Sequence, residues 1–265
     1  MSQVRVIAID WSGRAFGAEK TIWLAEAAAG RIVRLENGRD RDEIASWLIA
    51  DAARDTRMVI GFDFAFSLPA WYVREGFGTA PALWAAMHAG RADELLAKCA
   101  PPFWGKPGKP RPRLPEHFRV TDRAHSIGGI RPKSVFQVGG AGAVGTGSLR
   151  GMPVLHRLRE AGFSVWPFCE GGPPRVIEIY PRLMTGPVNK SDPAARAAYL
   201  DAHYTSLDPA LRRRAASTED AFDAAVSALV MSQHTHELAA LPPAADEQER
   251  IEGRIWAPEG ATCGY

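Results

Sequence analysis

Three short apolar segments, each with one carboxylate near its end, constrain most strongly how this chain of 265 residues folds. They are residues 4–10, which end at Asp10, residues 58–63, which end at Asp63, and residues 175–180, which contain Glu178. Apolar runs of this length indicate buried strands. A charge on such a strand is costly unless it has a partner. We therefore expect the three carboxylates to meet at one edge of one sheet.

The N-terminal part of the chain predicts the element order β-β-β-α-β. In chain order, the segments are strands at 4–10, 21–26 and 31–35, a helix at 40–53 and a strand at 58–63. Polar and apolar side chains alternate in the third strand, as in a strand with one wet face, and Asp40 can cap the helix. This order predicts an α/β fold with a mixed sheet flanked by helices, in a single domain that spans residues 1–265.

The remaining segments predict further elements around this core. Helices are expected at 70–98 in two or three pieces, 152–161, 193–204, 209–215 and 218–236, and strands at 134–138, 163–168 and 175–180. Residues 101–115 contain six prolines, which excludes a regular element there. We therefore interpret residues 70–133 as an insertion that is first helical and then rich in proline, lysine and arginine.

The second half of the insertion is strongly basic. Residues 98–133 hold nine Lys or Arg against two acidic residues, in a chain whose net charge is +2. They form either a solvated loop or an arm that contacts nucleic-acid phosphates, in which Phe103, Trp104 and Phe118 can stack on bases. The candidate substrate contacts are Lys106, Lys109, Arg111 and Arg113 in this arm, and Ser12 and Arg182 near the acidic strands.

A glycine-rich segment follows the strand expected at 134–138. Residues 140–145 fit the G-x-G-x-x-G pattern of dinucleotide-binding loops. That pattern requires a helix to begin within the glycines, whereas further glycines and Pro153 predict a helix start near residue 152. We therefore favour a loop whose glycines let the backbone approach another segment closely.

The helix expected at 218–236 supplies the remaining acidic candidates. Asp220 lies in its first turn, where an acid also stabilises a helix N-terminus. Asp223 lies at the border of an apolar stripe that includes Val226 and Val230, among small residues that allow close approach to a sheet. The sequence does not decide which aspartate acts as the helix ligand, although helix geometry favours Asp223.

Together these acids offer only oxygen ligands, which suit Mg²⁺ or Mn²⁺ rather than Zn²⁺. The predicted catalytic residues are Asp10, Asp63, Glu178 and Asp223, and the same four with Asp220 are the predicted metal ligands. Two such ions can activate water and stabilise the leaving oxygen in phosphodiester cleavage. Taken alone, each acid could instead be a strand-end or capping residue with a structural role.

Ordered motifs along nearly the whole chain resemble one family. They are Asp10-Trp11-Ser12-Gly13, Gly61-Phe62-Asp63-Phe64 with Ser67-Leu68-Pro69, Ser134-Val135-Phe136-Gln137 with a glycine loop that ends Ser148-Leu149-Arg150-Gly151, Glu178-Ile179-Tyr180-Pro181-Arg182, and Asp220-Ala221-Phe222-Asp223-Ala224. The set resembles domain-of-unknown-function family 429, although Ala65 stands where the family has proline. The resemblance implies an RNase H-like fold and the metal-dependent nuclease activity predicted for that family, with DNA or RNA as partner.

Two other classes of protein stay open. An ATP-dependent phosphotransferase of the actin or sugar-kinase type shares the RNase H-like fold, and Asp10-Trp11-Ser12-Gly13 resembles its first phosphate loop. The bulky Phe-Ala-Phe sequence after Asp63 and the short chain count against it. The third class is a non-catalytic module that binds nucleic acid through the basic arm, because phosphate contacts need only Lys and Arg.

Composition limits the classes of partner, cysteine chemistry and cellular location that we expect for the protein. A net charge of +2 is too small to indicate a nucleic-acid or membrane partner by itself, and three cysteines without C-x-x-C spacing predict neither a disulfide framework nor a cysteine metal site. No apolar stretch reaches the ~18 residues of a membrane span, and Arg5 and Asp10 interrupt the only early apolar run. We therefore expect a soluble, cytoplasmic protein.

Overall fold

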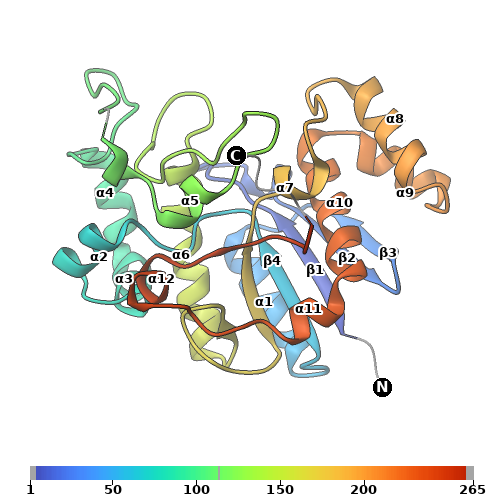
Figure 1. Cartoon of the computed structure of the whole chain (residues 1–265), viewed down its shortest axis with the longest axis horizontal. Helices are drawn as coiled ribbons and strands as arrows, with labels where there is room; N and C mark the ends of the chain where they lie inside the picture. The colour runs from blue at the N-terminus through green and yellow to red at the C-terminus, as the bar shows by residue number, and fades with distance from the viewer. Residues whose placement is uncertain (1–3, 113, 261–265) are drawn as a thin grey trace.

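A seven-stranded mixed sheet forms the centre of the protein in a computed structural model that describes residues 4–112 and 114–260 (Figure 1). The strands are β1 (Arg5–Asp10), β2 (Trp23–Ala28), β3 (Arg31–Glu36), β4 (Met58–Phe62), β5 (Ser164–Val165), β6 (Arg175–Ile179) and β7 (Ile255–Trp256). Their order is β3-β2-β1-β4-β6-β5, and β7 also pairs with β6. The three acid-bearing segments β1, β4 and β6 are thus parallel neighbours.

The first three strands form an antiparallel meander, and α1 (Arg41–Ala52) leads from it to β4. Asp40 caps α1 in a reciprocal arrangement, because its carboxylate accepts from the Glu43 N–H while the Glu43 carboxylate accepts from the Asp40 N–H. The predicted order β-β-β-α-β is therefore confirmed, and so is an α/β fold whose sheet is flanked by helices.

The other helices include those predicted at 70–98, 193–204 and 209–215, and short helices at 120–124, 182–185 and 247–252 that were not predicted. They are α2 (Ala70–Gly76), α3 (Ala80–Ala86), α4 (Ala92–Lys98), α5 (Val120–Ala124), α6 (Val144–Glu160), α7 (Arg182–Thr185), α8 (Pro193–His203), α9 (Pro209–Ala216), α10 (Glu219–Gln233), α11 (Thr235–Ala239) and α12 (Glu247–Glu252), with a π-helical turn at Met87–Arg91 and 3-10 turns at Ala18–Lys20 and Pro115–His117. The helix predicted at 218–236 is divided at His234, whose backbone is not helical, into α10 and α11.

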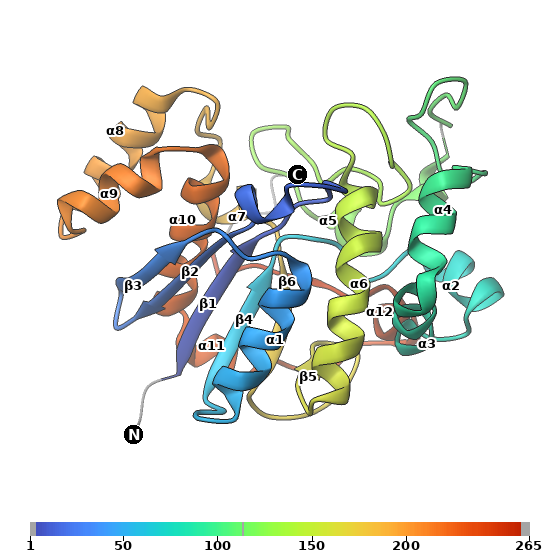
Figure 2. The same cartoon turned by 180° about the vertical axis from the view of Figure 1, so that it is seen from behind.

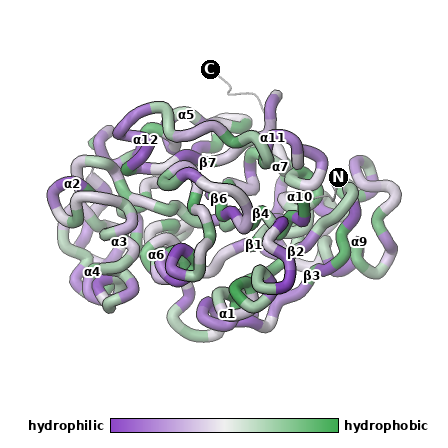
Figure 3. Tube along the Cα trace, turned by 90° about the horizontal axis from the view of Figure 1, so that it is seen from below, coloured by the Kyte–Doolittle hydropathy of each residue, from purple (hydrophilic) through white to green (hydrophobic). Residues whose placement is uncertain are grey.

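Helices cover both faces of the sheet. One face packs against α1 and α6, with α2, α3 and α4 beyond α6, and this side buries Ile9, Ile60 and Phe62 (Figure 2). The other face packs against α10, and this side buries Ala8 and Ile177. Figure 3 shows β1 and β4 between these two layers. Burial on both faces explains why the parallel strands read as continuous apolar runs.

The strand predicted at 134–138 does not form. Val135, Phe136 and Val138 are buried, but their backbone pairs with Trp104 of the insertion and not with the sheet. The Trp104 N–H donates to the Phe136 carbonyl at 3.0 Å, and the Val138 N–H donates to the Trp104 carbonyl at 2.9 Å. The apolar pattern correctly predicts burial, but the partner of this segment is the proline-rich arm and not the sheet.

The helix predicted at 152–161 begins eight residues earlier, at Val144. Its glycines lie where α6 touches other segments. A Cβ on Gly145 would lie 2.1 Å from the Val135 carbonyl oxygen, one on Gly151 would lie 2.6 Å from the Phe64 ring, and one on Gly13 would lie 2.6 Å from the Gly147 nitrogen. The predicted role of the glycines in close approach is confirmed, but they act within a helix.

The strand predicted at 163–168 contains only Ser164 and Val165. The chain turns directly after them, because the Phe168 N–H donates back to the Val165 carbonyl at 3.0 Å and Pro167 has no N–H to offer a ladder. No helix in the described ranges is long and apolar enough to cross a membrane.

Candidate functional site

Asp10 and Asp63 leave the sheet side by side. β1 and β4 are parallel and pair Ile9 with Phe62, and the Asp63 N–H donates to the Ile9 carbonyl at 3.0 Å. The carboxyl ends of parallel strands meet at one edge of a sheet, so both carboxylates reach the same place. In Figures 1 and 2 the loops of the insertion and the α8–α9 pair both project on this side of the molecule.

The helix α10 brings Asp223 and Asp220 to the same edge. Thr218 caps this helix by accepting from the Ala221 N–H, and small alanine side chains let α10 pack closely across β1 and β2. Asp223 is buried, whereas Asp220 is partly exposed. The charge of Asp223 also raises the pKa values of Asp10 and Asp63, so its carboxylate lies near the strand acids, whereas that of Asp220 lies nearer the solvent.

Burial raises the pKa values of all four aspartates, and repulsion from neighbouring acids adds to it. For Asp10, burial is the largest cause, and Asp63, Asp223 and Asp220 add repulsion, so that its pKa lies well above the usual range. Burial, and then the charge of Asp223, raise the pKa of Asp63 to about 7. Burial also raises the pKa values of Asp223 and Asp220. Such a site favours protons or cations.

One cation lies within this acidic cluster, and the sequence did not single it out. Lys190, in the loop between α7 and α8, donates its ammonium to Asp223 Oδ2. Its charge also lowers the pKa values of Asp10 and Asp63, against the larger effect of burial. The second oxygen of Asp223, Oδ1, is buried and has no hydrogen-bond partner in the described residues. A single lysine in a loop carries no motif that could have predicted this contact.

The fourth predicted ligand, Glu178, lies in β6 beside Asp63 but has partners of its own. Arg119 donates to both of its oxygens, at 2.6 and 2.8 Å, and the Phe66 N–H donates to one of them at 2.9 Å. Arg119 also donates to Asp122 at 2.8 Å, and its side chain is 1% exposed. One arginine of the basic arm is thus a buried structural residue, and Glu178 stays a predicted ligand whose oxygens are already occupied.

The two predicted substrate contacts near the acidic strands hold loops in place. Ser12 Oγ accepts from Thr21 Oγ1 at 2.8 Å, and its carbonyl accepts from Arg41 at 2.6 Å. Arg182 donates to the Val188 carbonyl at 2.7 Å, in the loop that carries Lys190. Neither side chain hydrogen-bonds an acid of the cluster in the described residues, although the charge of Arg182 lowers the pKa of Asp223.

The predicted substrate contacts in the basic arm have different surroundings in the structure. Lys106 donates to the Leu96 carbonyl, whereas Lys109 is exposed. The exposed Arg111 has its guanidinium 5.5 Å from the Trp104 ring centre, and Arg113 lies outside the described residues. A cavity of about 1370 Å³ lies under this arm, lined by Trp71, Tyr72, Phe77, Phe103, Trp104 and Lys109 among others.

A smaller cavity connects the acidic edge with the basic arm and α6. Its volume is about 270 Å³, and Asp63, Trp11, Lys133 and Tyr180 are among its lining residues. Burial and the neighbouring Asp63 raise the pKa of Tyr180 to about 12. The indole N–H of Trp11 is buried without a hydrogen-bond partner in the described part of the chain. This cavity gives a ligand a route to Asp63.

The acidic cluster matches a divalent cation in chemistry but not in present geometry. Its donors are carboxylate oxygens, which Mg²⁺ and Mn²⁺ prefer, and Asp223 Oδ1 is an unpartnered buried acceptor. However, no three His, Cys, Asp or Glu side chains of residues 4–112 and 114–260 are arranged so that they could hold a metal ion as they stand. Binding would require the carboxylates to turn toward one another, and an ion would have to compete with the Lys190 ammonium for Asp223.

Comparison with known protein families finds a match. A family described as Protein of unknown function (DUF429) matches residues 9–248, which include all the acids described above. Searches of curated proteins and of solved structures each find no match.

Proposed function

Because the chain belongs to the DUF429 family, whose description assigns no function, we propose one from the site itself: divalent-metal-dependent hydrolysis of phosphodiester bonds in a nucleic acid. The observation that carries the proposal is the convergence of Asp10, Asp63 and Asp223, from β1, β4 and α10, with one ammonium as their sole ion-pair partner in the described residues. Buried carboxylates without partners are costly and mark functional sites.

The topology supports an RNase H-like assignment of the fold. An antiparallel meander is followed by a helix and by a strand parallel to the first, in the order β3-β2-β1-β4. Acids stand at the ends of the first and fourth strands and on a late helix. This placement is the one that the sequence resemblance implied, and it supports the same class of chemistry.

The residues of the chain would divide the work as follows. Asp10, Asp63 and Asp223 would hold Mg²⁺ or Mn²⁺, and Asp220 would hold a water ligand nearer the solvent. When bound, such an ion lowers the pKa of water and stabilises the leaving oxygen of a phosphate ester. Arg119 fixes Glu178, which in turn accepts from the Phe66 N–H and so holds the segment that follows Asp63. The exposed Lys109 and Arg111 would attract the phosphates.

Metal binding tests the proposal without a guess about substrate. We expect Mn²⁺ titrated into EDTA-treated wild type by calorimetry to bind, and Asp10→Asn to weaken that binding at least about tenfold, because one of three ligands loses its charge. The variant should keep its circular dichroism spectrum. Equal binding by both proteins, or none by wild type at millimolar Mn²⁺, would remove the basis of the proposal.

Cleavage assays then test the reaction. Labelled single- and double-stranded DNA and RNA should be cut by wild type with Mn²⁺ and not by Asp10→Asn or Asp63→Asn. Nucleic-acid binding that survives EDTA and both substitutions, with no cleavage by wild type, would favour a non-catalytic binding module instead. ATP hydrolysis by wild type without cleavage would favour a phosphotransferase.

A further inference from the structure

Lys190 reaches the acidic cluster because its loop is fixed on both sides. Arg196, a buried residue of α8, donates to the Lys190 carbonyl and to the Ala216 carbonyl at 3.0 Å. Ala216 ends α9, directly before the capped start of α10, so this arginine ties the loop to the helix that carries Asp223. Arg182 fixes the other end of the loop at the Val188 carbonyl. Two buried or half-buried arginines therefore hold the lysine over the acids.

The contact of Lys190 differs from an ordinary structural ion pair. The side chains of Lys190 and Asp223 are only 12% and 10% exposed, so both charges have lost most of their water. A buried pair stabilises a fold only when its remaining atoms are also satisfied. Here Asp223 Oδ1 has no partner in the described residues, and Asp10 and Asp63 form no ion pair in them. The lysine thus compensates one carboxylate of three and leaves the carboxyl groups of Asp10 and Asp63 for a ligand.

We propose that the Lys190 ammonium takes the place of one metal ion, so that the site binds a single divalent cation and not two. This inference rests on the proposed function. When ionised, the buried Asp10 and Asp223 and the half-buried Asp63 carry, together with one ammonium, two negative charges, which one divalent ion neutralises; the charge of Asp220 is partly screened, because that side chain is in contact with solvent. A second ion would have to bind Asp223 next to the Lys190 ammonium, which already donates to that carboxylate. Two neighbouring positive charges repel strongly in a buried site.

The stoichiometry of Mn²⁺ binding tests this inference. Calorimetry and electron paramagnetic resonance on EDTA-treated wild type should give one ion with no magnetic coupling between ions. Lys190→Met should bind two ions, and its first ion should bind about tenfold more tightly, because a competing positive charge is gone. Lys190→Arg should keep one ion. Lys98→Met, at an exposed lysine of α4, is the matched control and should behave as wild type.

The possible failures are distinguishable. Two coupled ions in wild type, or one ion with unchanged affinity in folded Lys190→Met, would overturn the role of Lys190 while leaving a metal site. Lys190→Gln, which keeps a polar side chain of similar length, replaces Lys190→Met if that variant loses its circular dichroism spectrum. If wild type binds no Mn²⁺ and Asp10→Asn does not differ from it, the proposed function itself fails.

Discussion

Two groups of buried charges lie next to each other at this edge of the sheet, and they are built in opposite ways. Around Arg119, the guanidinium faces Glu178 and Asp122, and the carboxylate of Glu252 accepts from the Ala70 and Val120 N–H groups. Around Lys190, one ammonium faces Asp223, while Asp10 and Asp63 have no ion-pair partner in the described ranges. The first group is saturated with partners and the second is not.

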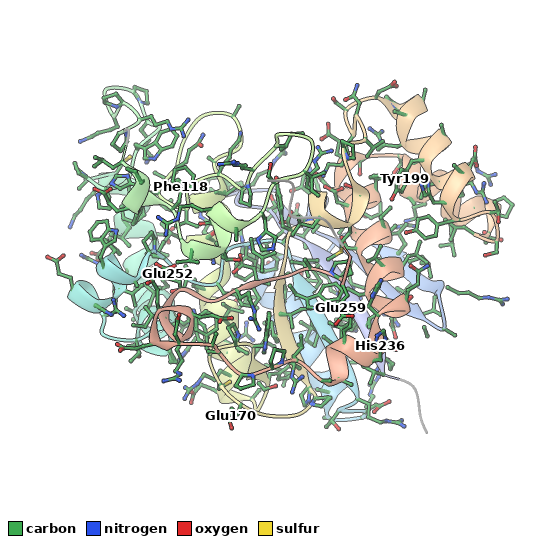
Figure 4. All side chains as sticks on the ribbon, in the orientation of Figure 1. Phe118, Glu170, Tyr199, His236, Glu252 and Glu259 are labelled. Atoms are coloured by element: carbon green, nitrogen blue, oxygen red, sulfur yellow. The ribbon has the colours of Figure 1, made fainter. Side chains whose placement is uncertain are left out.

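The difference separates a structural role from a functional one. The Arg119 group joins three distant parts of the chain, because Arg119 lies in the insertion and donates to Glu178 of β6 and to the Glu252 carbonyl at the end of α12. Figure 4 shows Glu252 on the side of the insertion, opposite Tyr199 of α8. Loss of the Arg119 group would cost stability. The acids of the Lys190 group that have no ion-pair partner do not stabilise the fold, so we expect them to bind a ligand.

The largest expected effect is on the saturated group. Arg119→Met should lower the free energy of unfolding by about 3–5 kcal/mol, because it leaves Glu178 and Asp122 buried without their cation. Urea denaturation followed by circular dichroism measures this. Arg123→Met, at an exposed arginine of the same short helix α5, should stay within about 0.5 kcal/mol of wild type. Similar costs for the two variants would contradict the contrast.

A glycine contact beside the site gives the next effect. Gly151→Ala should destabilise the protein by about 1–3 kcal/mol, because the new methyl group would lie 2.6 Å from the Phe64 ring and push on the segment after Asp63. Gly76→Ala is the matched control, since a Cβ there meets nothing within 4 Å. Thermal unfolding of both variants, together with Mn²⁺ affinity, would show whether the packing of α6 also positions Asp63.

Removing a charge from the unsaturated group should raise the stability of the protein, whereas Arg119→Met lowers it, and should also change how stability depends on pH. Because folding raises the pKa of Asp63 from 3.8 to about 7, the folded protein binds more protons than the unfolded chain between those values. The metal-free protein should therefore lose stability as pH rises from about 4 to about 7. Asp63→Asn should raise stability at pH 8 by about 1–2 kcal/mol and flatten this dependence.

The same denaturation series contains its own control. Asp122→Asn should destabilise the protein at pH 8, because Arg119 then loses a charged partner. The assignment of the two groups is reversed if Asp63→Asn destabilises the metal-free protein and Asp122→Asn does not.

The smallest effect concerns the exposed part of the basic arm. Lys109→Gln should weaken nucleic-acid binding a few-fold and reduce the slope of log affinity against log salt by about one, because one phosphate contact is lost. Fluorescence anisotropy at several salt concentrations measures this. Lys106→Gln should change the slope less, since Lys106 already donates to the Leu96 carbonyl. Arg54→Gln, after α1, should leave both quantities unchanged.

Much of the fold was predictable because its signals are local. Apolar runs gave β1, β4 and β6, and the capping pair Asp40 and Glu43 marks the start of α1. The wrong predictions concern segments that are buried as expected but that pack against a part of the chain other than the predicted one. Residues 134–138 pair with Trp104 instead of the sheet, and the glycines of α6 permit helix packing instead of breaking the helix.

The sequence by itself determined that acids stand at the ends of buried strands and that Asp223 lies at the border of the apolar stripe of its helix. Only the tertiary structure decided which acids are paired. Glu178 and Arg119 are 59 positions apart, and Lys190 and Asp223 are 33 apart. No periodicity or motif links such residues, because a long-range ion pair depends on how whole elements pack. The tertiary structure therefore distinguishes an acid that stabilises the fold from one that is free to bind.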